Sequence, residues 1–395
     1  MPRKILHLDL DAFFCAVEEN RDPSLRGKAF AIGGRPDQRG VVASCSYAAR
    51  KHGVHSALPM FQAVRLYPDL IIRPADHSAY HAVSVQVMNQ FDALTPDVEP
   101  ISIDEAFLDV TLLRDDAESV AQRLQALINA EFNLPCSLGV ATNKLVAKIA
   151  NNIGKMRAGK DSPPNAILVV PPGEEAAFLA PLPVGELWGV GPKTAEQLRR
   201  IGIRTIGDLA GRTAAEMERR FGKHGIDMLR HAQGIDERPV QRDDEAKSIS
   251  KETTFIHDVT DAEQLKRVMR GLSDEVGRRL RREGLLGTTV KVKLRWADFT
   301  TLTRQVKLAQ PTNHDNVIFE TAWGLVLKTW TPGRPVRLIG VGVSDFEVTS
   351  VQRTLWGEET NAQRDRLESA LDDLHDRFGR NSVRRASDML DEEQT

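Results

Sequence analysis

Cysteine is scarce in this chain of 395 residues, which has only Cys15, Cys45 and Cys136. An odd number of widely spaced cysteines fits neither a disulfide framework nor the ligand spacing of a zinc site. We therefore expect free thiols and a reducing cytosol.

Long apolar runs are also missing. No stretch approaches the ~20 consecutive apolar residues that a membrane-spanning helix needs, so we expect no membrane association. The first residues run directly into a strand pattern, and we expect no signal peptide. With 41% apolar and 27% charged residues, the composition is typical of a soluble globular protein of about two to four domains.

A strong net charge is absent as well. The formal net charge is −2, which alone argues against nucleic-acid binding. Residues 350–395 hold 7 basic and 11 acidic side chains, so they carry −4 and leave +2 for the rest of the chain. Because clusters of basic residues, and not totals, attract phosphate, nucleic-acid binding stays open.

The first part of the chain mixes strand and helix patterns, which favours an α+β layer with helices on one face. Strands are predicted at 4–11, 98–103, 106–111 and 136–141, and helices at 12–20, 78–94, 115–131 and 143–153. We expect Asp11 to N-cap the helix over 12–20.

The later segments change in character. Residues 154–172 predict a loop, 181–234 predict short helices, and 236–247 predict an exposed charged linker. A strand–helix–strand unit then repeats, in the order strand 247–256, helix 261–283, strands 288–297 and 301–309, helix 313–331 and strand 336–346. This βαββαβ order predicts a four-stranded sheet covered by two helices.

Three carboxylates lie in apolar surroundings. Asp104 and Glu105 are adjacent in an apolar run, and Asp9 lies in a strand pattern near the start. Burying an uncompensated charge costs several kcal/mol, so such carboxylates need a partner, usually a divalent cation. If the two strands are neighbours, the three side chains would hold two Mg²⁺ ions for phosphoryl transfer. The alternative is a turn capped by Asp9 and an ordinary exposed hairpin turn.

A basic cluster surrounds Tyr47 and Arg50, which share one face of a predicted helix. The arginine fork fits phosphate oxygens, although a solvated basic helix face is the alternative. Lys155 and Lys160, in the predicted loop, leave the same choice between a triphosphate contact and ordinary surface lysines.

Gly189, Gly191, Lys193 and Thr194 lie in a helix–hairpin–helix pattern. Glycine lets the backbone approach a ligand closely, and free amides at the start of the next helix bind a DNA phosphate without reading the base sequence. A plain helical turn is the alternative.

Residues 290–296 alternate strictly between apolar and basic side chains. Lys291, Lys293 and Arg295 would form a row on one sheet face, near the basic cluster over 278–282. The row predicts either a surface that tracks a DNA backbone or a solvated sheet face, and the cluster also fits compensation of a helix dipole.

Near the C-terminus, Gln352, Leu355 and Trp356 form a short peptide that would dock in a partner's groove or pack on its own domain. An amphipathic apolar stripe follows over 367–378 and predicts a packed helix.

Taken together, these segments resemble the Y-family translesion DNA polymerases, and specifically the DNA polymerase IV branch. The resemblance runs from about residue 4 to 346 and is carried by LDLDAFFCAVE, SYAARKHGV, SIDEAFLDV and GVATNKLVAKIA, in the family's order and spacing. It implies a right-hand fold with a palm (1–11 and 76–166), fingers (12–75), a helical thumb (167–234), a linker (235–246), a little finger (247–346) and a tail (347–395).

The resemblance also implies residue roles. Asp9, Asp104 and Glu105 would be catalytic and bind two Mg²⁺ ions, with the Leu10 carbonyl joining the metal near the triphosphate. The resemblance assigns the nucleotide triphosphate to Tyr47, Arg50 and Lys155, with Ser44 nearby. Phe14 matches the steric gate that excludes a 2′-hydroxyl. Small side chains at Val41, Ala43 and Ala57 would cover the nascent base pair and leave a permissive site of low fidelity.

The implied partners are primer–template DNA, a dNTP and, through the peptide over 352–356, the sliding clamp; the implied state is a monomer without a proofreading nuclease. The chain departs from the family after Lys155, where Met156 stands in place of the usual proline, and in the acidic tail behind the clamp peptide. Two other classes remain as alternatives: a non-catalytic DNA-damage accessory protein and a nucleotidyl cyclase.

Overall fold

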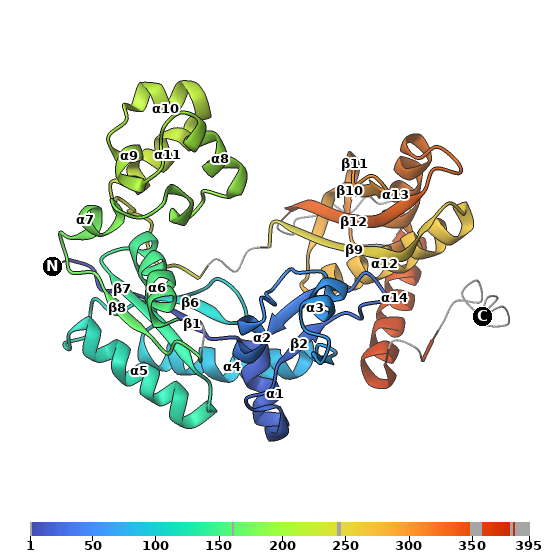
Figure 1. The fold of residues 1–395 in the computed structure, drawn as a ribbon. Coiled ribbons are helices and arrows are strands. Elements are labelled where there is room, and N and C mark those ends of the chain that lie inside the picture. The colour runs from blue at the N-terminus through green and yellow to red at the C-terminus, as the bar shows by residue number, and fades with distance from the viewer. Residues whose placement is uncertain (1, 160–161, 243–245, 348–357, 380–381, 384–395) are drawn as a thin grey trace. The chain divides into compact units, whose positions relative to one another are not determined.

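The computed structural model describes residues 2–159, 162–242, 246–347, 358–379 and 382–383 (Figure 1). It divides the chain into two compact units, Met1–Asp243 and Asp244–Thr395. Among the described helices, none combines the length and the apolarity that crossing a bilayer requires. All three cysteines are free and buried, which confirms the expectation of free thiols.

A five-stranded sheet organises the first unit, in the order β5-β6-β1-β7-β8. Its strands are β1 (Ile5–Leu10), β5 (Val98–Pro100), β6 (Glu105–Asp109), β7 (Cys136–Ala141) and β8 (Ile167–Val169). β1 pairs antiparallel with β6 and β7, and β8 pairs parallel with β7. The sequence predicts four of these strands and misses β8, because β8 lies in the stretch over 154–172 whose glycine and proline content predicts a loop.

Helices cover both faces of this sheet, so the expectation of helices on one face is wrong. Leu6, Leu8 and Leu10 pack in one core with α4 (His77–Leu94) and α5 (Ala117–Phe132). The alternate residues of β1 face α6 (Lys144–Ala158) on the other side. In β1 the leucines alternate with His7 and Asp9, so the strand is apolar toward α4 and α5 and carries polar side chains toward α6.

A smaller sheet, β3-β2-β4, follows the helix α1 (Phe13–Arg21) and the short 3-10 turn η1 (Pro23–Leu25). The elements of this part are β2 (Phe30–Gly33), β3 (Val42–Cys45), α2 (Tyr47–Lys51), α3 (Met60–Leu66) and β4 (Ile71–Arg73). They enclose a separate small core.

Asp11 does not N-cap α1, contrary to expectation. The cap residue is Ala12, with φ 48°, and no side chain bonds to the helix start. The carboxylate of Asp11 is buried and accepts hydrogen bonds from the Ser137 hydroxyl (2.8 Å) and the Asn165 N–H (3.0 Å). These buried donors satisfy the carboxylate better than an exposed helix start would.

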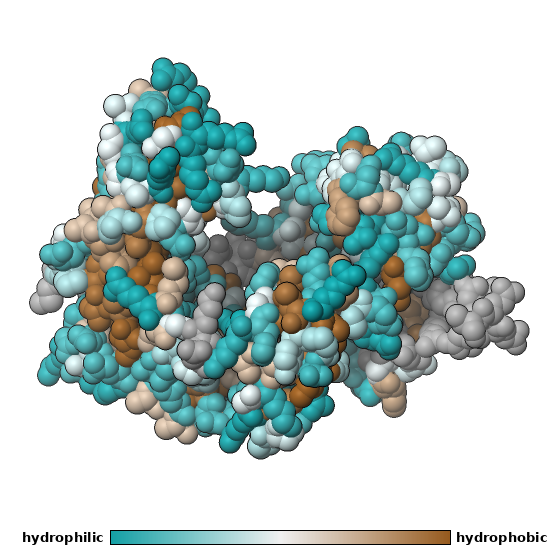
Figure 2. All heavy atoms as spheres, in the orientation of Figure 1, coloured by the Kyte–Doolittle hydropathy of each residue, from teal (hydrophilic) through white to brown (hydrophobic). Residues whose placement is uncertain are grey.

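The rest of the first unit is helical, as predicted for 181–234. It consists of α7 (Glu175–Leu179), η2 (Val184–Glu186), α8 (Pro192–Arg200), α9 (Ile206–Ala210), α10 (Ala214–Phe221) and α11 (Lys223–Ala232). Their apolar side chains share a core with α6, whereas Figure 2 shows a largely hydrophilic surface over α8 and α10. The expected exposed linker begins later than predicted, because Asp236 and Val240 are each only 5% exposed.

The second unit has the predicted βαββαβ order. Its elements are β9 (Ser248–Val259), α12 (Ala262–Arg282), β10 (Leu286–Trp296), β11 (Thr301–Thr312), α13 (Asp315–Thr329) and β12 (Val336–Glu347). The sheet order is β11-β10-β12-β9, and both helices pack on it in one core.

A last helix, α14 (Glu358–Phe378), contacts the rest of the second unit through charged side chains. Arg281 of α12 donates to Asp372 (2.7 Å) and Glu368 (3.2 Å). Leu367 and Phe378 are 61% and 71% exposed, so the prediction that the apolar stripe packs is wrong for these residues. The ion pairs place the acidic side chains against the unit and turn these apolar ones outward.

Candidate active site

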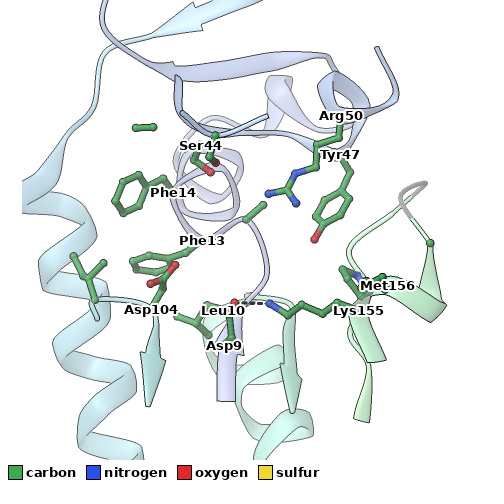
Figure 3. A pocket seen from close by; sticks show the side chains of 16 residues that line it. Asp9, Leu10, Phe13, Phe14, Ser44, Tyr47, Arg50, Asp104, Lys155 and Met156 are labelled. Carbon is green, nitrogen blue, oxygen red and sulfur yellow. Dashed lines mark hydrogen bonds and ion pairs between the residues drawn. The ribbon is translucent and has the colours of Figure 1, made fainter. Parts of the chain in front are cut away.

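A cavity of about 580 Å³ opens in the first unit beside the end of β1 (Figure 3). It is lined by Asp9, Leu10, Ala12, Phe13, Phe14, Ala43, Ser44, Tyr47, Arg50, Ser56, Ile103, Asp104, Lys155, Met156, Gly159 and Pro164. These side chains come from β1, α1, β3, α2, α6 and the turns between elements. The fold thus gathers on one cavity most of the residues assigned to the metals and the nucleotide.

The two aspartates reach the cavity through the pairing of β1 with β6. Asp9 lies directly opposite Glu105, and the Leu10 N–H donates to the Asp104 carbonyl (2.9 Å). The Asp104 carboxylate accepts from the Ser102 hydroxyl (2.5 Å). The strand neighbourhood on which the metal prediction depends is therefore present.

The three carboxylates do not form a ready-made metal cage. Among the described residues, no group of three or more His, Cys, Asp or Glu side chains is arranged to hold a metal ion. Asp9 and Asp104 line the cavity, whereas Glu105 does not and pairs with Lys148. The joint binding of two ions by all three stays a prediction.

Lys155 lies on α6 and not in a loop, which corrects the prediction for residues 154–172. A side chain at Gly154 would meet Leu168 of β8 at 3.3 Å, so glycine lets the helix continue past that strand. Lys155 pairs with Asp9 and with Asp11 (3.0 Å). The helix end therefore brings a cation to the Asp9 carboxylate. Lys160 lies outside the described residues.

Burial changes the pKa values of Asp9 and Lys155. Removal from water raises the pKa of Asp9 to about 6, against the opposing pull of the Lys155 ammonium. Burial would lower the pKa of Lys155, but Asp9 and Asp11 outweigh it and raise that pKa. A buried carboxylate that already holds a cation is a suitable position for a metal ligand.

Glu105 is held by two polar residues, Lys148 and His7. Its Oε2 accepts from Lys148 Nζ (2.6 Å) and lies 3.2 Å from His7 Nε2. Burial alone would raise the pKa of Glu105, but these two partners lower it to about 2. Burial also lowers the pKa of His7 to about 4, and its Nδ1 lies 2.9 Å from the Asn151 amide nitrogen. The neutral ring thus donates to Glu105 and accepts from Asn151.

Tyr47 and Arg50, which are predicted to bind the triphosphate, lie across the cavity from the aspartates (Figure 3). Ser46 N-caps α2 by accepting from the Ala49 N–H, and this cap fixes the start of the helix. The Arg50 guanidinium lies 4.7 Å from the centre of the Tyr47 ring. Burial raises the pKa of Tyr47, so its hydroxyl stays a neutral donor.

Phe14 lines the cavity and is fixed from behind by an aromatic partner. Its ring stacks on Tyr80 of α4 at 4.3 Å and 16°, and His77 meets it edge-on at 5.9 Å. The Tyr80 hydroxyl donates to Glu18 (2.9 Å). This support gives Phe14 the rigidity that a steric gate needs.

Two predicted nucleotide residues lie elsewhere. Ala43 and Ser44 line the cavity, but Val41 and Ala57 do not. Val41 is 47% exposed and forms an isolated bridge with Pro59, and Ala57 has φ 68°. Their assignment to the nascent base pair stays a prediction about a complex with DNA.

The predicted helix–hairpin–helix turn has the expected backbone. Gly189 has φ 94°, Gly191 caps α8, and Pro192 takes the first helical position. No side chain bonds to this helix start, which leaves its N–H groups, with the exposed Lys193 beside them, for an outside acceptor. Thr194 lies one residue further along α8.

In the second unit, β10 separates its apolar and basic side chains as predicted. Val290, Val292, Leu294 and Trp296 are buried against the two helices. Lys293 pairs with Glu252 (2.8 Å), and Arg295 donates to the Thr301 hydroxyl (2.8 Å). Lys291 is exposed beside them, so the basic row lies on the helix-free face.

Sequence reasoning missed His7, Lys148, Asn151 and Tyr80, which hold the site residues in place. A signal was available for one of them. Lys144, Lys148 and Lys155 recur at helical spacing, so they lie on the same side of α6. Each pairs with a carboxylate of the sheet, namely Glu99, Glu105 and Asp9.

Comparison with known proteins agrees with this fold. Three family models match: the impB/mucB/samB family over 8–152, its helix–hairpin–helix motif over 172–203 and its C-terminal domain over 246–355. A DNA polymerase IV from Dehalococcoides mccartyi is 39% identical over 385 residues, which is 96% of each chain. One from Alkalilimnicola ehrlichii is 40% identical over 345 residues, 87% of this chain and 95% of the relative.

Solved structures show the same similarity. A Y-family DNA polymerase chimera of Dbh and Dpo4 has a TM-score of 0.78 at 26% identity and covers 88% of this chain and 100% of its own. An insertion ternary complex of Dbh DNA polymerase has a TM-score of 0.62 with the same identity and coverage. The chain therefore belongs to the impB/mucB/samB family, the Y-family of DNA-directed DNA polymerases. Within that family its relatives named above are DNA polymerase IV proteins.

Proposed function

We propose that this chain extends the 3′-hydroxyl of a primer with deoxynucleotides on a DNA template, releases pyrophosphate, and copies damaged templates with low fidelity. The carrying observation is the single cavity that Asp9 and Asp104 line together with Tyr47, Arg50 and Lys155. Two carboxylates, two cations and a neutral hydroxyl donor at one cavity suit a nucleotide triphosphate that is bound together with metal ions.

The oxygen donors fit Mg²⁺. Asp9 and Asp104 are carboxylates at the cavity, Glu105 lies opposite Asp9, and hard oxygen ligands are those that Mg²⁺ prefers. Two bound Mg²⁺ ions would lower the pKa of the primer hydroxyl and neutralise the leaving phosphates. Asp9, Asp104 and Glu105 would hold them, together with the Leu10 carbonyl.

The other cavity residues position the nucleotide. Arg50 and Tyr47 would bind the triphosphate oxygens, and Lys155 would exchange its contact with Asp9 for a phosphate once a metal ion takes its place. Phe14 would lie under the sugar and exclude a 2′-hydroxyl. Catalysis would thus come from positioning and charge compensation.

The first test replaces Asp104. We expect Asp104→Ala and Asp104→Asn to lose Mg²⁺-dependent primer extension by on the order of 10³-fold, because a metal ligand supplies several kcal/mol in such reactions. DNA binding, measured by fluorescence anisotropy with a labelled primer–template, should stay nearly unchanged.

Asp109→Asn is the matched control. Asp104 directly precedes β6, and Asp109 is the last residue of that strand, where it accepts a hydrogen bond from the Thr111 N–H (2.9 Å). The Asp109→Asn variant therefore loses one negative charge, as Asp104→Asn does, but at the end of β6 far from Asp9. Full activity of the Asp104 variants would contradict the site assignment. Wild-type DNA binding without extension would favour an accessory protein, and cyclisation of a nucleotide would favour a cyclase.

Two finer points belong to this proposal. The family models leave only short segments of this chain between and behind them, so we propose that these 395 residues hold no proofreading nuclease. We also propose that the protein acts as a monomer and that Gln352, Leu355 and Trp356 bind the sliding clamp. Those three residues lie outside the described part of the chain.

A further inference from the structure

Two side chains, those of Trp188 and Lys148, connect the glycine turn before α8 to Glu105, the proposed metal ligand. Trp188 directly precedes Gly189 in that turn, and its ring packs at 5.7 Å and 49° on Phe107 of β6. Phe107 and Glu105 are two residues apart on one strand and therefore face the same side of the sheet. The turn thus reaches the face of the sheet on which Glu105 is held.

Lys148 bridges the remaining gap. Its ammonium lies 5.7 Å from the centre of the Trp188 ring and 2.6 Å from Glu105 Oε2. A cation within about 6 Å of an indole is attracted to the ring, so the ammonium is bound from both sides. Its side chain is only 16% exposed, and solvent screens these contacts little.

The Trp188 ring is held in place by Arg238 and Asp236. The Arg238 guanidinium lies 4.8 Å from its ring and pairs with Asp236 at 2.7 Å. Asp236 in turn accepts from the Leu145 N–H (3.0 Å) in the first turn of α6. A shift of the glycine turn must therefore move the ring against α6, the helix that carries Lys148.

Both donors to Glu105 act on one oxygen. Lys148 and His7 contact Oε2, and within the described residues Oε1 accepts no hydrogen bond. This geometry directs Oε1 away from α6. A change in the position of Lys148 would therefore turn the carboxylate.

We propose that Lys148 is a positioning residue that couples the DNA-facing glycine turn, through Trp188, to the orientation of Glu105. The inference rests on the proposed function, in which Glu105 holds a metal ion. When the turn binds a DNA phosphate, Trp188 and Lys148 fix Glu105 for catalysis; binding at Glu105 is sensed at Trp188 in return, since coupling between two sites is reciprocal.

The chain contains a matched control one helical turn earlier. Lys144 pairs with Glu99 at 2.7 Å and lies 5.7 Å from the Phe107 ring, with 7% of its side chain exposed. It has the same kind of ion pair and the same ring distance as Lys148. Its partner Glu99 has no place in the proposed site, so Lys144→Met removes a buried ion pair without breaking the coupling.

The test uses the full chain labelled with 5-fluorotryptophan, with the Trp188 resonance assigned from Trp188→Phe by ¹⁹F NMR. Mg²⁺ and dATP are added without DNA, so that no reaction occurs. We expect the Trp188 resonance to shift in the wild type and in Lys144→Met, and to stay in place in Lys148→Met. Equal shifts in both lysine variants, or none in the wild type, would overturn the coupling.

Kinetics supply the second readout. We expect Lys148→Met to lower kcat for primer extension roughly 10- to 100-fold, as for other residues that orient metal ligands, with little change in KM for dATP. Lys148→Arg should recover part of kcat because it keeps the cation. The double variant with Trp188→Leu should be no slower than Lys148→Met alone, since the two residues act in series.

The two proposals fail differently. If the wild type extends primers with Mg²⁺ but Lys148→Met matches Lys144→Met in kcat, the coupling is wrong and the proposed function stands. If the wild type extends no primer, the proposed function is wrong, and the coupling falls with it. Melting temperatures of both lysine variants show whether a loss of kcat reflects lost folding.

Discussion

At the scale of single residues, Phe14 is expected to decide which sugar enters the cavity. The ring stands at the cavity wall with Tyr80 stacked behind it, so it has no space to retreat from a 2′-hydroxyl. We predict that Phe14→Ala lowers the preference for dATP over ATP roughly 10- to 100-fold. The measurement is kcat/KM for each nucleotide in single-nucleotide primer extension.

Tyr80→Phe provides the comparison for this prediction. It keeps the stacked ring but removes the hydroxyl that donates to Glu18 at 2.9 Å. The sugar preference should therefore stay near that of the wild type. Unchanged preference in Phe14→Ala would remove the gate role from this residue.

Residue types and spacing predicted the residues that line the cavity better than the residues that hold them in place. Asp9, Asp104, Tyr47 and Arg50 line one cavity. They could be predicted because each lies in a motif of recognisable chemistry. The contacts of Lys148 with Glu105 and Trp188 depend on how α6 crosses the sheet. No local pattern encodes such a crossing, so the supporting residues become visible only in the structure.

At the scale of single elements, the start of α8 is expected to bind a DNA phosphate. Gly191 caps the helix and no side chain satisfies its first N–H groups, so Lys193 adds its charge to a site already suited to an anion. We predict that Lys193→Ala weakens binding of all DNA sequences alike. A salt titration should show the slope of log K against log [salt] reduced by about one.

Arg200→Ala tests whether any positive charge on α8 would act this way. Arg200 is at the far end of the same helix and pairs with Glu196 at 3.2 Å. Its removal should leave the salt slope unchanged. An equal effect of both variants would mean that overall charge, and not the helix start, binds the phosphate.

Element prediction succeeded where apolar periods were long and failed at short or interrupted segments. The second unit matches its predicted order throughout, because its strands and helices each show several periods of side-chain alternation. β8 was missed because it lies in the stretch over 154–172, whose glycine and proline content predicts a loop. The end of α6 was missed because Gly154 reads as a helix breaker, although it is the close approach of β8 that requires glycine there.

At the scale of the whole molecule, the two compact units have separate cores, so unfolding is expected to occur in more than one step. Each unit then has its own dependence on pH. The second unit contains a buried cluster in which Arg281 contacts Asp315 (2.8 Å), Glu368 and Asp372. Three carboxylates share one guanidinium there, which leaves an excess of negative charge.

Burial of Asp315 in this cluster makes the stability of the second unit fall as pH rises. Burial raises the pKa of Asp315 to about 7, against the opposing pull of Arg281. Between its ordinary value near 4 and about 7, the folded chain keeps a proton that the unfolded chain has lost. The free energy of unfolding therefore falls across this range, by at most about 1.4 kcal/mol per pH unit.

Calorimetry from pH 5 to pH 8 provides the check, with Asp315→Asn as the test variant and Asp298→Asn as its control. The neutral amide at 315 should flatten the pH dependence of the transition that belongs to the second unit. Turn hydrogen bonds, first the one from the Thr300 N–H, hold the pKa of Asp298 below its usual range, so its replacement should leave that dependence as in the wild type. A parallel decline in all three proteins would assign the effect to other groups and show that Asp315 is already ionised at pH 5.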